Sequence, residues 1–212
     1  TEGRELGELF EYAFGLPVTV RRNQSAMLPF LQQPIDARKL LIYSDRSSPN
    51  PRTAAELTNK TGKTLDGGPI TVFDANAYAG EALVETVKSG DKRLISYGVD
   101  LGTRISTAMS PGRSDVREVH ARNGMLVTKY AQEMKRVYSI RNVDAKAKTL
   151  IIEHPITPGY VLTGTVKPVE TTQKAYRFEV ALKANESVEF GVSEENVYDQ
   201  QTQVSTDRKS VV

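Results

Sequence analysis

The sequence predicts an all-β protein: two immunoglobulin-like antiparallel β-sandwich units related by an internal repeat, with little or no helix. Short apolar runs alternate with Gly, Asn, Asp and Pro, roughly every 8–12 residues, which is the spacing typical of β-sandwiches. The one helix-like segment, residues 53–57, is too short to be stable by itself. Two similar strand–turn–strand patterns complete the argument for duplicated β units, with one extended sandwich as the alternative.

Three features mark the two copies of the repeat. Each copy has an Asn after an alternating apolar run, Asn59 in the first and Asn142 in the second. A Lys-Thr-Leu sequence follows the turn, at residues 63–65 in the first copy and 148–150 in the second. A Gly-Val pair marks the closing strand, at 98–99 in the first copy and 191–192 in the second. We therefore predict a first unit over residues 1–110 and a second over 111–212. The Pro-Gly-Arg-Ser sequence at 111–114 is the candidate boundary.

The first half of the chain contains several predicted strands. Residues 9–14 are apolar and aromatic, residues 18–20 resume the pattern, and residues 26–31 form an apolar run that Pro29 restricts to an edge or bulge. Residues 39–43 are apolar on both faces and predict a buried strand. Residues 44–51 contain only polar residues and Pro, which predicts an exposed, mobile loop.

The rest of the chain continues this pattern. Residues 52–100 form the first copy of the repeat, and residues 101–110 form another alternating run. Residues 116–130 are strand-like although their apolar spacing is uneven. The second copy occupies residues 137–197, with a longer insertion at 159–173. The polar tail at 200–212 is expected to fray.

Composition narrows the class of protein. The 212 residues are 39% hydrophobic and 25% charged, as in a soluble globular protein, and no apolar run is long enough for a transmembrane helix. The absence of Cys excludes disulfides, a thiol nucleophile and Cys-ligated metals, and leaves the compartment open. A net charge of +2 argues against a nucleic-acid partner.

Positive charge is concentrated in one part of the chain. Residues 101–150 carry ten Lys or Arg against four Asp or Glu, a local balance of +6, and this basic region runs from Arg104 to Lys148. One interpretation is an anionic partner surface, such as a phosphate-bearing glycan or lipid. The other is that these are solvated outward positions of strands. The region lacks the interleaved aromatic residues of nucleic-acid platforms, which favours the second interpretation.

Catalytic motifs are absent from the sequence. Neither His120 nor His154 has metal-ligand spacing, and His154, before Pro155, is expected to have a hydrogen-bonded structural role. There is no nucleophile elbow, phosphate-binding loop or dinucleotide motif. We therefore predict no catalytic residues, no cofactor and no metal. The only weak candidates are three carboxylates, Asp74, Glu81 and Asp100, as an acid/base pair or as calcium ligands. The alternative for these three is a role as solvated strand ends and turn caps.

Nine tyrosines offer two further interpretations. Exposed Tyr side chains stack on sugars or fill protein interfaces. Tyr at alternating positions is also typical of a half-buried sandwich wall, which we favour.

An ordered series of short motifs resembles the C-terminal β domain of the bacterial mucoidy-inhibitor-like proteins, a family of unknown function. The motifs are Phe-Glu-Tyr at 10–12, Pro-Val-Thr-Val at 17–20, Gln-Ser-Ala-Met-Leu-Pro at 24–29, Leu-Thr-Asn-Lys-Thr-Gly at 57–62, Gly-Pro-Ile-Thr-Val-Phe at 68–73, Tyr-Ala-Gly-Glu-Ala at 78–82 and Tyr-Gly-Val-Asp at 97–100. The resemblance implies a mainly β domain that follows a coiled-coil segment, and a periplasmic or extracellular location, with the cytoplasm as the alternative. It implies no catalytic residues.

Two functions follow as expectations. The favoured one is a non-enzymatic, envelope-associated interaction or structural module, whose partner is a protein or the rest of its own parent chain. This chain is then expected to be an excised C-terminal part. The alternative is a carbohydrate-active or carbohydrate-binding protein that uses the loop carboxylates.

Overall fold

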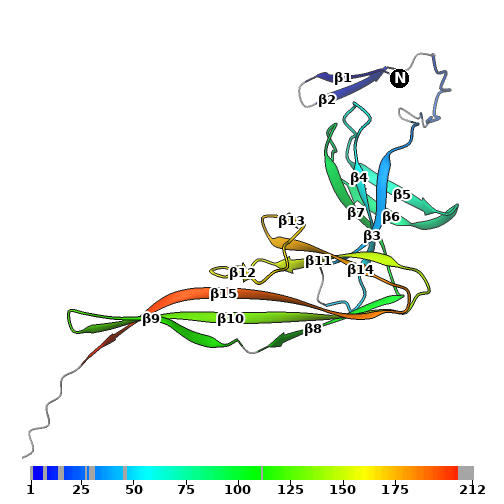
Figure 1. Ribbon diagram of the computed structural model, residues 1–212. Coiled ribbons are helices and arrows are strands. Elements are labelled where there is room, and N and C mark those ends of the chain that lie inside the picture. Colours follow the sequence, from blue (N-terminus) through cyan, green and yellow to red (C-terminus); the bar gives the residue numbers. More distant parts are fainter. Residues whose placement is uncertain are drawn as a thin grey trace, which may run out of the picture. The chain divides into compact units, whose positions relative to one another are not determined.

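The computed structural model describes residues 2–6, 9–13, 17–26, 28, 32–44, 47–110 and 112–204. Within these residues all regular structure is β-strand, as predicted, and no helix is present that is long and apolar enough to cross a membrane. The strands form several sheets (Figure 1). Two compact units can be distinguished, one of residues 1–40 and 52–99, the other of residues 41–51 and 100–212.

The first unit contains the strands that precede residue 100. They are β1 (Glu2–Leu6), β2 (Leu9–Ala13), the start of β3 (Asp36–Tyr43), β4 (Arg52–Thr58), β5 (Gly68–Asp74), β6 (Ala77–Val84) and β7 (Lys92–Val99). The antiparallel pairs are β1–β2, β4–β7 and β5–β6. Gly80 in β6 lies against β7, where an added Cβ would be 1.9 Å from the Tyr97 carbonyl oxygen. Only glycine permits this approach.

The second unit contains the end of β3 and all later strands. They are β8 (Thr103–Ser110), β9 (Ser114–Arg122), β10 (Met125–Asn142), β11 (Lys148–Pro155), β12 (Val161–Thr163), β13 (Glu170–Thr171), β14 (Ala175–Leu182) and β15 (Ser187–Gln203). One sheet has the order β12-β15-β10-β8, with β9 also paired to β10. In the other, β14 lies between β13 and β11, and β11 pairs with β3 in parallel. That parallel pair departs from the antiparallel prediction, because β3 and β11 come from distant parts of the chain.

Both sheets of the second unit contribute to one hydrophobic core. Its buried members are Leu41, Tyr43, Ile105, Tyr138, Ile140, Leu150, Ile152, Phe178, Val180, Leu182 and Val192. The apolar residues at 40–43 are all buried, which confirms the strand predicted there. Apolar burial of this kind is the main favourable contribution to folding.

The two compact units differ from the predicted division into 1–110 and 111–212. Strand β8, assigned by the prediction to the first domain, pairs with β10. Strand β9, which follows the predicted boundary at 111–114, pairs with the same β10. The Pro-Gly-containing segment therefore connects two strands of one sheet within the second unit.

Several local predictions require correction. Residues 18–20 form no strand, and the Val side chains there are exposed. Residues 47–51 are not a free loop, because the Asn50 side-chain amide donates to the carbonyls of Asp100 and Thr103, 3.2 and 2.8 Å away. The tail is ordered through Gln203, since β15 pairs with β10 as far as that residue. The predicted strand at 26–31 and the tail from 205 lie mostly or wholly outside the described residues.

The two asparagines of the predicted repeat occupy matching local environments. Both are 1% exposed. The Asn59 Nδ2 donates to the carbonyls of Lys63 and Val87, and the Asn142 Nδ2 donates to those of Lys146 and Lys183, all at 2.8–2.9 Å. In each case Oδ1 accepts from the backbone N–H two residues later, at 3.1 Å. These hydrogen bonds make Lys63 equivalent to Lys146. The repeat in the sequence had instead aligned Lys63 with Lys148, two residues later.

Candidate functional site: an uncovered three-stranded ribbon

The predicted carboxylates do not form a common site within the first unit. Asp74 and Glu81 lie on the β5–β6 hairpin, where Glu81 is opposite Thr71. Because side chains alternate along a strand, Thr71 and Glu81 point to one face and Asp74 to the other. Asp74 also forms an ion pair with Lys39. The pair is therefore not arranged as an acid and base across a cleft.

Asp100 belongs to the second unit and is neutralised there by a lysine. The Lys148 Nζ lies 2.7 Å from Oδ2 of Asp100 and 2.7 Å from Oδ2 of Asp144. The Thr103 hydroxyl donates to the same Asp100 oxygen at 2.6 Å. Burial alone would raise the pKa of the Asp100 carboxyl, but the hydrogen bonds from Lys148 and Thr103 and the lysine charge outweigh burial and lower the pKa. The Lys148 ammonium group thus lies between the two carboxylates, where a metal ion bound by them would have to lie.

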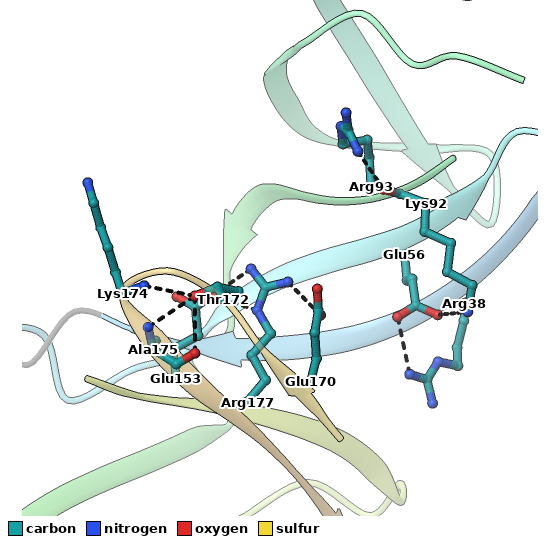
Figure 2. A network of polar contacts seen from close by, with 10 residues as sticks. All are labelled: Arg38, Glu56, Lys92, Arg93, Glu153, Glu170, Thr172, Lys174, Ala175 and Arg177. Atoms are coloured by element: carbon teal, nitrogen blue, oxygen red, sulfur yellow. Dashed lines mark hydrogen bonds and ion pairs between the residues drawn. The ribbon is translucent and has the colours of Figure 1, made fainter. Parts of the chain in front are cut away.

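Surface carboxylates elsewhere are also paired with cations, as Figure 2 shows for two separate networks. In the first unit, Glu56 lies 3.5 Å from the Arg38 guanidinium and 3.8 Å from the Lys92 Nζ. In the second unit, Arg177 contacts Glu153 at 2.7 Å and Glu170 at 2.8 Å. In each of these ion pairs a neighbouring cation balances the negative charge of the carboxylate. Within the described residues, no group of three or more His, Asp or Glu side chains is arranged to hold a metal ion.

Four of the ten cations in the basic region likewise have a close acidic neighbour. Close carboxylates accompany several of its cations, in the pairs Arg113–Asp115, Arg117–Glu195, Lys129–Glu118 and Lys148–Asp100. Arg104 and Arg141 differ, since they are directly opposite each other on β8 and β10. Both line a pocket together with Ser106, Ser139, Ser187 and Glu189. This pocket therefore brings two cations directly opposite each other, with one carboxylate, Glu189, beside them.

A buried polar cluster lies at the edge of the second unit's core. The Tyr138 hydroxyl is 2.8 Å from Nδ1 of His154, and Nε2 of His154 is 3.3 Å from a carboxylate oxygen of Glu194. The Thr157 hydroxyl donates to the same carboxylate oxygen at 3.0 Å. All of His154 and 99% of Glu194 are removed from solvent. The hydrogen bonding predicted for His154 is thus present, and the group that it contacts is a buried tyrosine hydroxyl.

The most unusual surface of the second unit is a ribbon formed by β9 and the adjoining halves of β10 and β15. Strands β10 and β15 have 18 and 17 residues and pair along their full length. Figure 1 shows β9 and these strand halves continuing past β11 and β14, the strands that cover the core. Every residue of β9 is exposed. Among the described residues of the second unit, the ribbon is therefore a sheet without a covering layer.

The register of the ribbon places all charged side chains on one face. On the other face, four residues from each strand meet in cross-strand rows, and none carries a charge. From the tip inward, the rows are Ala121–Leu126–Thr202, Val119–Thr128–Gln200, Val116–Tyr130–Tyr198 and Ser114–Gln132–Asn196. We call this surface the uncharged face.

Large apolar side chains on the uncharged face remain exposed. Val116 and Val119 are 54% and 53% exposed, and Tyr198 is 42% exposed. The rings of Tyr130 and Tyr198 are stacked, with centroids 5.7 Å apart. Contiguous exposed apolar surface of this kind marks interaction sites. The tyrosines include both buried and exposed side chains, since Tyr138 lies in the core and Tyr198 does not. A role of the exposed ones in binding sugars or proteins stays a prediction.

The opposite face of the ribbon carries ion pairs. Glu118 lies 3.1 Å from the Lys129 Nζ and 3.1 Å from the His120 Nε2. Hydrogen bonds from Lys129 and His120 lower the pKa of the Glu118 carboxyl, and the bond to Glu118 raises the pKa of Lys129. The charged side chains of this face pair with one another and remain in water, so this face does not need a partner in the way that the uncharged face does.

A β-bulge in β9 produces this separation. Lys129 is opposite Glu118, but the next residue, Tyr130, is opposite Val116, so Arg117 is the extra residue. Arg117 pairs with Glu195 at 2.8 Å. Without the bulge, Arg117 would take the place of Val116 beside Tyr130. The three-residue spacing of Val116 and Val119 in the sequence is this bulge, whereas Met125 and Val127 break the apolar spacing because they lie on the charged face.

The uncharged face continues the core side of β10. Leu126, Thr128 and Tyr130 are separated by even numbers of residues from Tyr138 and Ile140, which are buried in the core. The β10–β15 register has no irregularity between them, so all five side chains share one side of the sheet. The ribbon thus extends one of the two sheets that form the core, and no described strand of the second unit packs on this part of it.

Sequence reasoning did not identify this site, although one signal was present. Asn123 and Gly124 form the β9–β10 turn, and both have positive φ. Asn-Gly between alternating strands is a strong hairpin signal. That signal would have located the hairpin, but not the charge-free face, which depends on the bulge and on pairing with β15.

The described residues thus define an all-β protein with an uncovered, uncharged sheet face. Comparisons with known proteins add no family assignment: no family model matches the chain. No curated protein and no solved structure matches it either.

Proposed function

We propose that this protein is a non-enzymatic interaction module that binds another protein chain through the uncharged face of its β9–β10–β15 ribbon. The observation that carries the proposal is the exposed apolar surface of that face, which includes Val116, Val119 and Tyr198. Binding would remove this surface from water at a gain of roughly 25 cal/mol per Å² before the costs of association.

The proposal includes an architecture of two immunoglobulin-like β-sandwich units related by an internal repeat. Matching hydrogen bonds of Asn59 and Asn142 support it, because each Asn closes the same kind of strand end. The returning turns also match, since Gly90 and Asn185 both have positive φ just before the closing strand. An envelope location is part of the proposal and rests on the family resemblance.

The carbohydrate-active alternative is less well supported. It requires Asp74, Glu81 or Asp100 to act on a substrate, yet Asp74 pairs with Lys39 and Asp100 with Lys148. Asp74 and Glu81 point to opposite faces of one hairpin. Retaining or inverting hydrolysis needs two carboxyls facing each other across the scissile bond.

Site-specific photo-cross-linking tests the proposed function. A photoreactive phenylalanine analogue replaces Tyr198 on the uncharged face or, as the matched control, Asp199 on the charged face. In an extract of the source cells, we expect Tyr198 to yield a discrete cross-linked protein, including a second copy of this chain, and Asp199 to yield none. Equal products from both positions, or none from Tyr198, would contradict the proposal.

A further inference from the structure

We propose that the partner of the uncharged face is a second copy of the same chain, with two ribbons packed face to face. This inference rests on the proposed function and names its partner. The same face that is covered by β11 and β14 near the core lacks a covering sheet along the ribbon. A second ribbon supplies such a layer, at the roughly 10 Å spacing of packed sheets.

Charge is the main reason for choosing a second copy. In a two-fold interface each surface meets its own copy, so any net charge on it repels itself. The four rows of the uncharged face contain no Asp, Glu, Lys, Arg or His. The charged face, by contrast, places Glu118, Lys129 and Asp199 in one row. Over the same stretch the opposite face carries three cations and three anions, so its net charge is also zero, but a second copy would have to remove these charges from water. The uncharged face avoids that cost.

The bulge at Arg117 supports the same conclusion. It removes a guanidinium group from the row of Tyr130 and Tyr198 and returns it to Glu195 on the other face. Inward-pointing charge is a common device against unwanted sheet association. Here the irregularity works in the opposite direction, because it clears charge from the centre of the face.

The size of the face determines the strength of the dimer. About a dozen residues per copy is roughly half of the 20–30 per side in a standard interface. Polar rows containing Thr128, Gln132 and Gln200 reduce the apolar area further. We therefore expect a reversible dimer with a dissociation constant in roughly the micromolar range.

Sedimentation velocity of the purified chain tests this inference. Between about 5 and 500 µM, the wild-type chain should shift from monomer to dimer. Tyr198→Lys should weaken association at least about tenfold, since like charges then meet in the interface. Asp199→Lys, the adjacent residue on the opposite face, should leave the dimer unchanged. Circular dichroism of both variants controls for folding.

A mixing experiment keeps the inference testable if one variant is less stable. Tyr198→Lys and Tyr198→Glu chains should each remain monomeric alone but associate when mixed, and salt should weaken the mixed dimer. A wild-type chain that stays monomeric throughout, or equal loss of association in Asp199→Lys, would overturn the inference. In that case, a different protein cross-linked at Tyr198 would leave the proposed function standing.

Discussion

Asn59 and Asn142 show how much a single buried amide organises at a strand end. Each side chain donates two hydrogen bonds to backbone carbonyls and accepts one from a backbone N–H. Buried backbone groups need hydrogen-bond partners, and both Asn side chains are 1% exposed. The alternating run before each Asn allowed the sequence analysis to identify these two residues. Their hydrogen bonds could not be predicted, because they also involve Val87 and Lys183 on segments that return from later in the chain.

We expect Asn59→Ala and Asn142→Ala each to lower the free energy of unfolding by about 1–3 kcal/mol, because each removes at least three hydrogen bonds at a buried position and leaves the backbone N–H of Thr61 or Asp144 without its side-chain acceptor. Urea denaturation measures the change. Gln173→Ala, at an exposed position, serves as the control and should change stability little. A change in either asparagine variant as small as in the control would contradict the matched structural roles.

Asp100 should make the free energy of unfolding depend on pH in the acidic range. Its pKa in the folded state is lowered from the ordinary value of 3.8, so the unfolded chain binds the proton first as pH falls. The stability that Asp100 contributes is therefore present above this value and is lost as pH decreases through the lower, folded-state pKa. Urea midpoints between roughly pH 2 and 5 should fall more steeply in wild type than in Asp100→Asn. Parallel curves would show that Lys148 does not stabilise the carboxylate.

At the scale of elements, strand pairing decides which side chains share a surface. Residues 114–122 read by simple alternation would place Val116 beside Glu118 and separate it from Val119. The bulge at Arg117 instead places Val116 and Val119 on the same face. A one-residue shift exchanges the two faces of a strand, and the shift here is local.

Deleting Arg117 should leave the ribbon intact. The deletion places Val116 directly before Glu118, which restores regular alternation while every other pair with β10 is kept. We expect a loss of about 1 kcal/mol or less, from the partly exposed Arg117–Glu195 pair. Deleting Val119 is the control, since it shifts residues of β9 to the wrong face. Thermal denaturation followed by circular dichroism distinguishes the two, and equal losses would be inconsistent with the bulge.

For the molecule as a whole, the predicted anionic partner surface remains a prediction. Its clearest basis is the Arg104–Arg141 pair, because like charges directly opposite on adjacent strands destabilise a sheet unless they are neutralised. An anionic surface would neutralise them. Four of the eight other cations of the region have acidic neighbours.

Binding to vesicles containing anionic lipid tests this surface. We expect Arg104→Gln together with Arg141→Gln to weaken binding several-fold and to reduce its salt dependence. Arg113→Gln, which removes a cation already paired with Asp115, is the matched control and should have little effect. Salt-independent binding, or none by the wild-type chain, would remove the anionic surface from consideration.

The sequence by itself determined the all-β class, the buried strand at residues 39–43 and the importance of Asn59 and Asn142. These features depend on local composition and alternation, which a linear pattern contains. Only the tertiary structure decided that Lys148 neutralises Asp100, that Asp74 and Glu81 point apart, and that one ribbon face is free of charge. Each of these depends on register between strands distant in the chain, and a single bulge is enough to reverse which face a residue occupies.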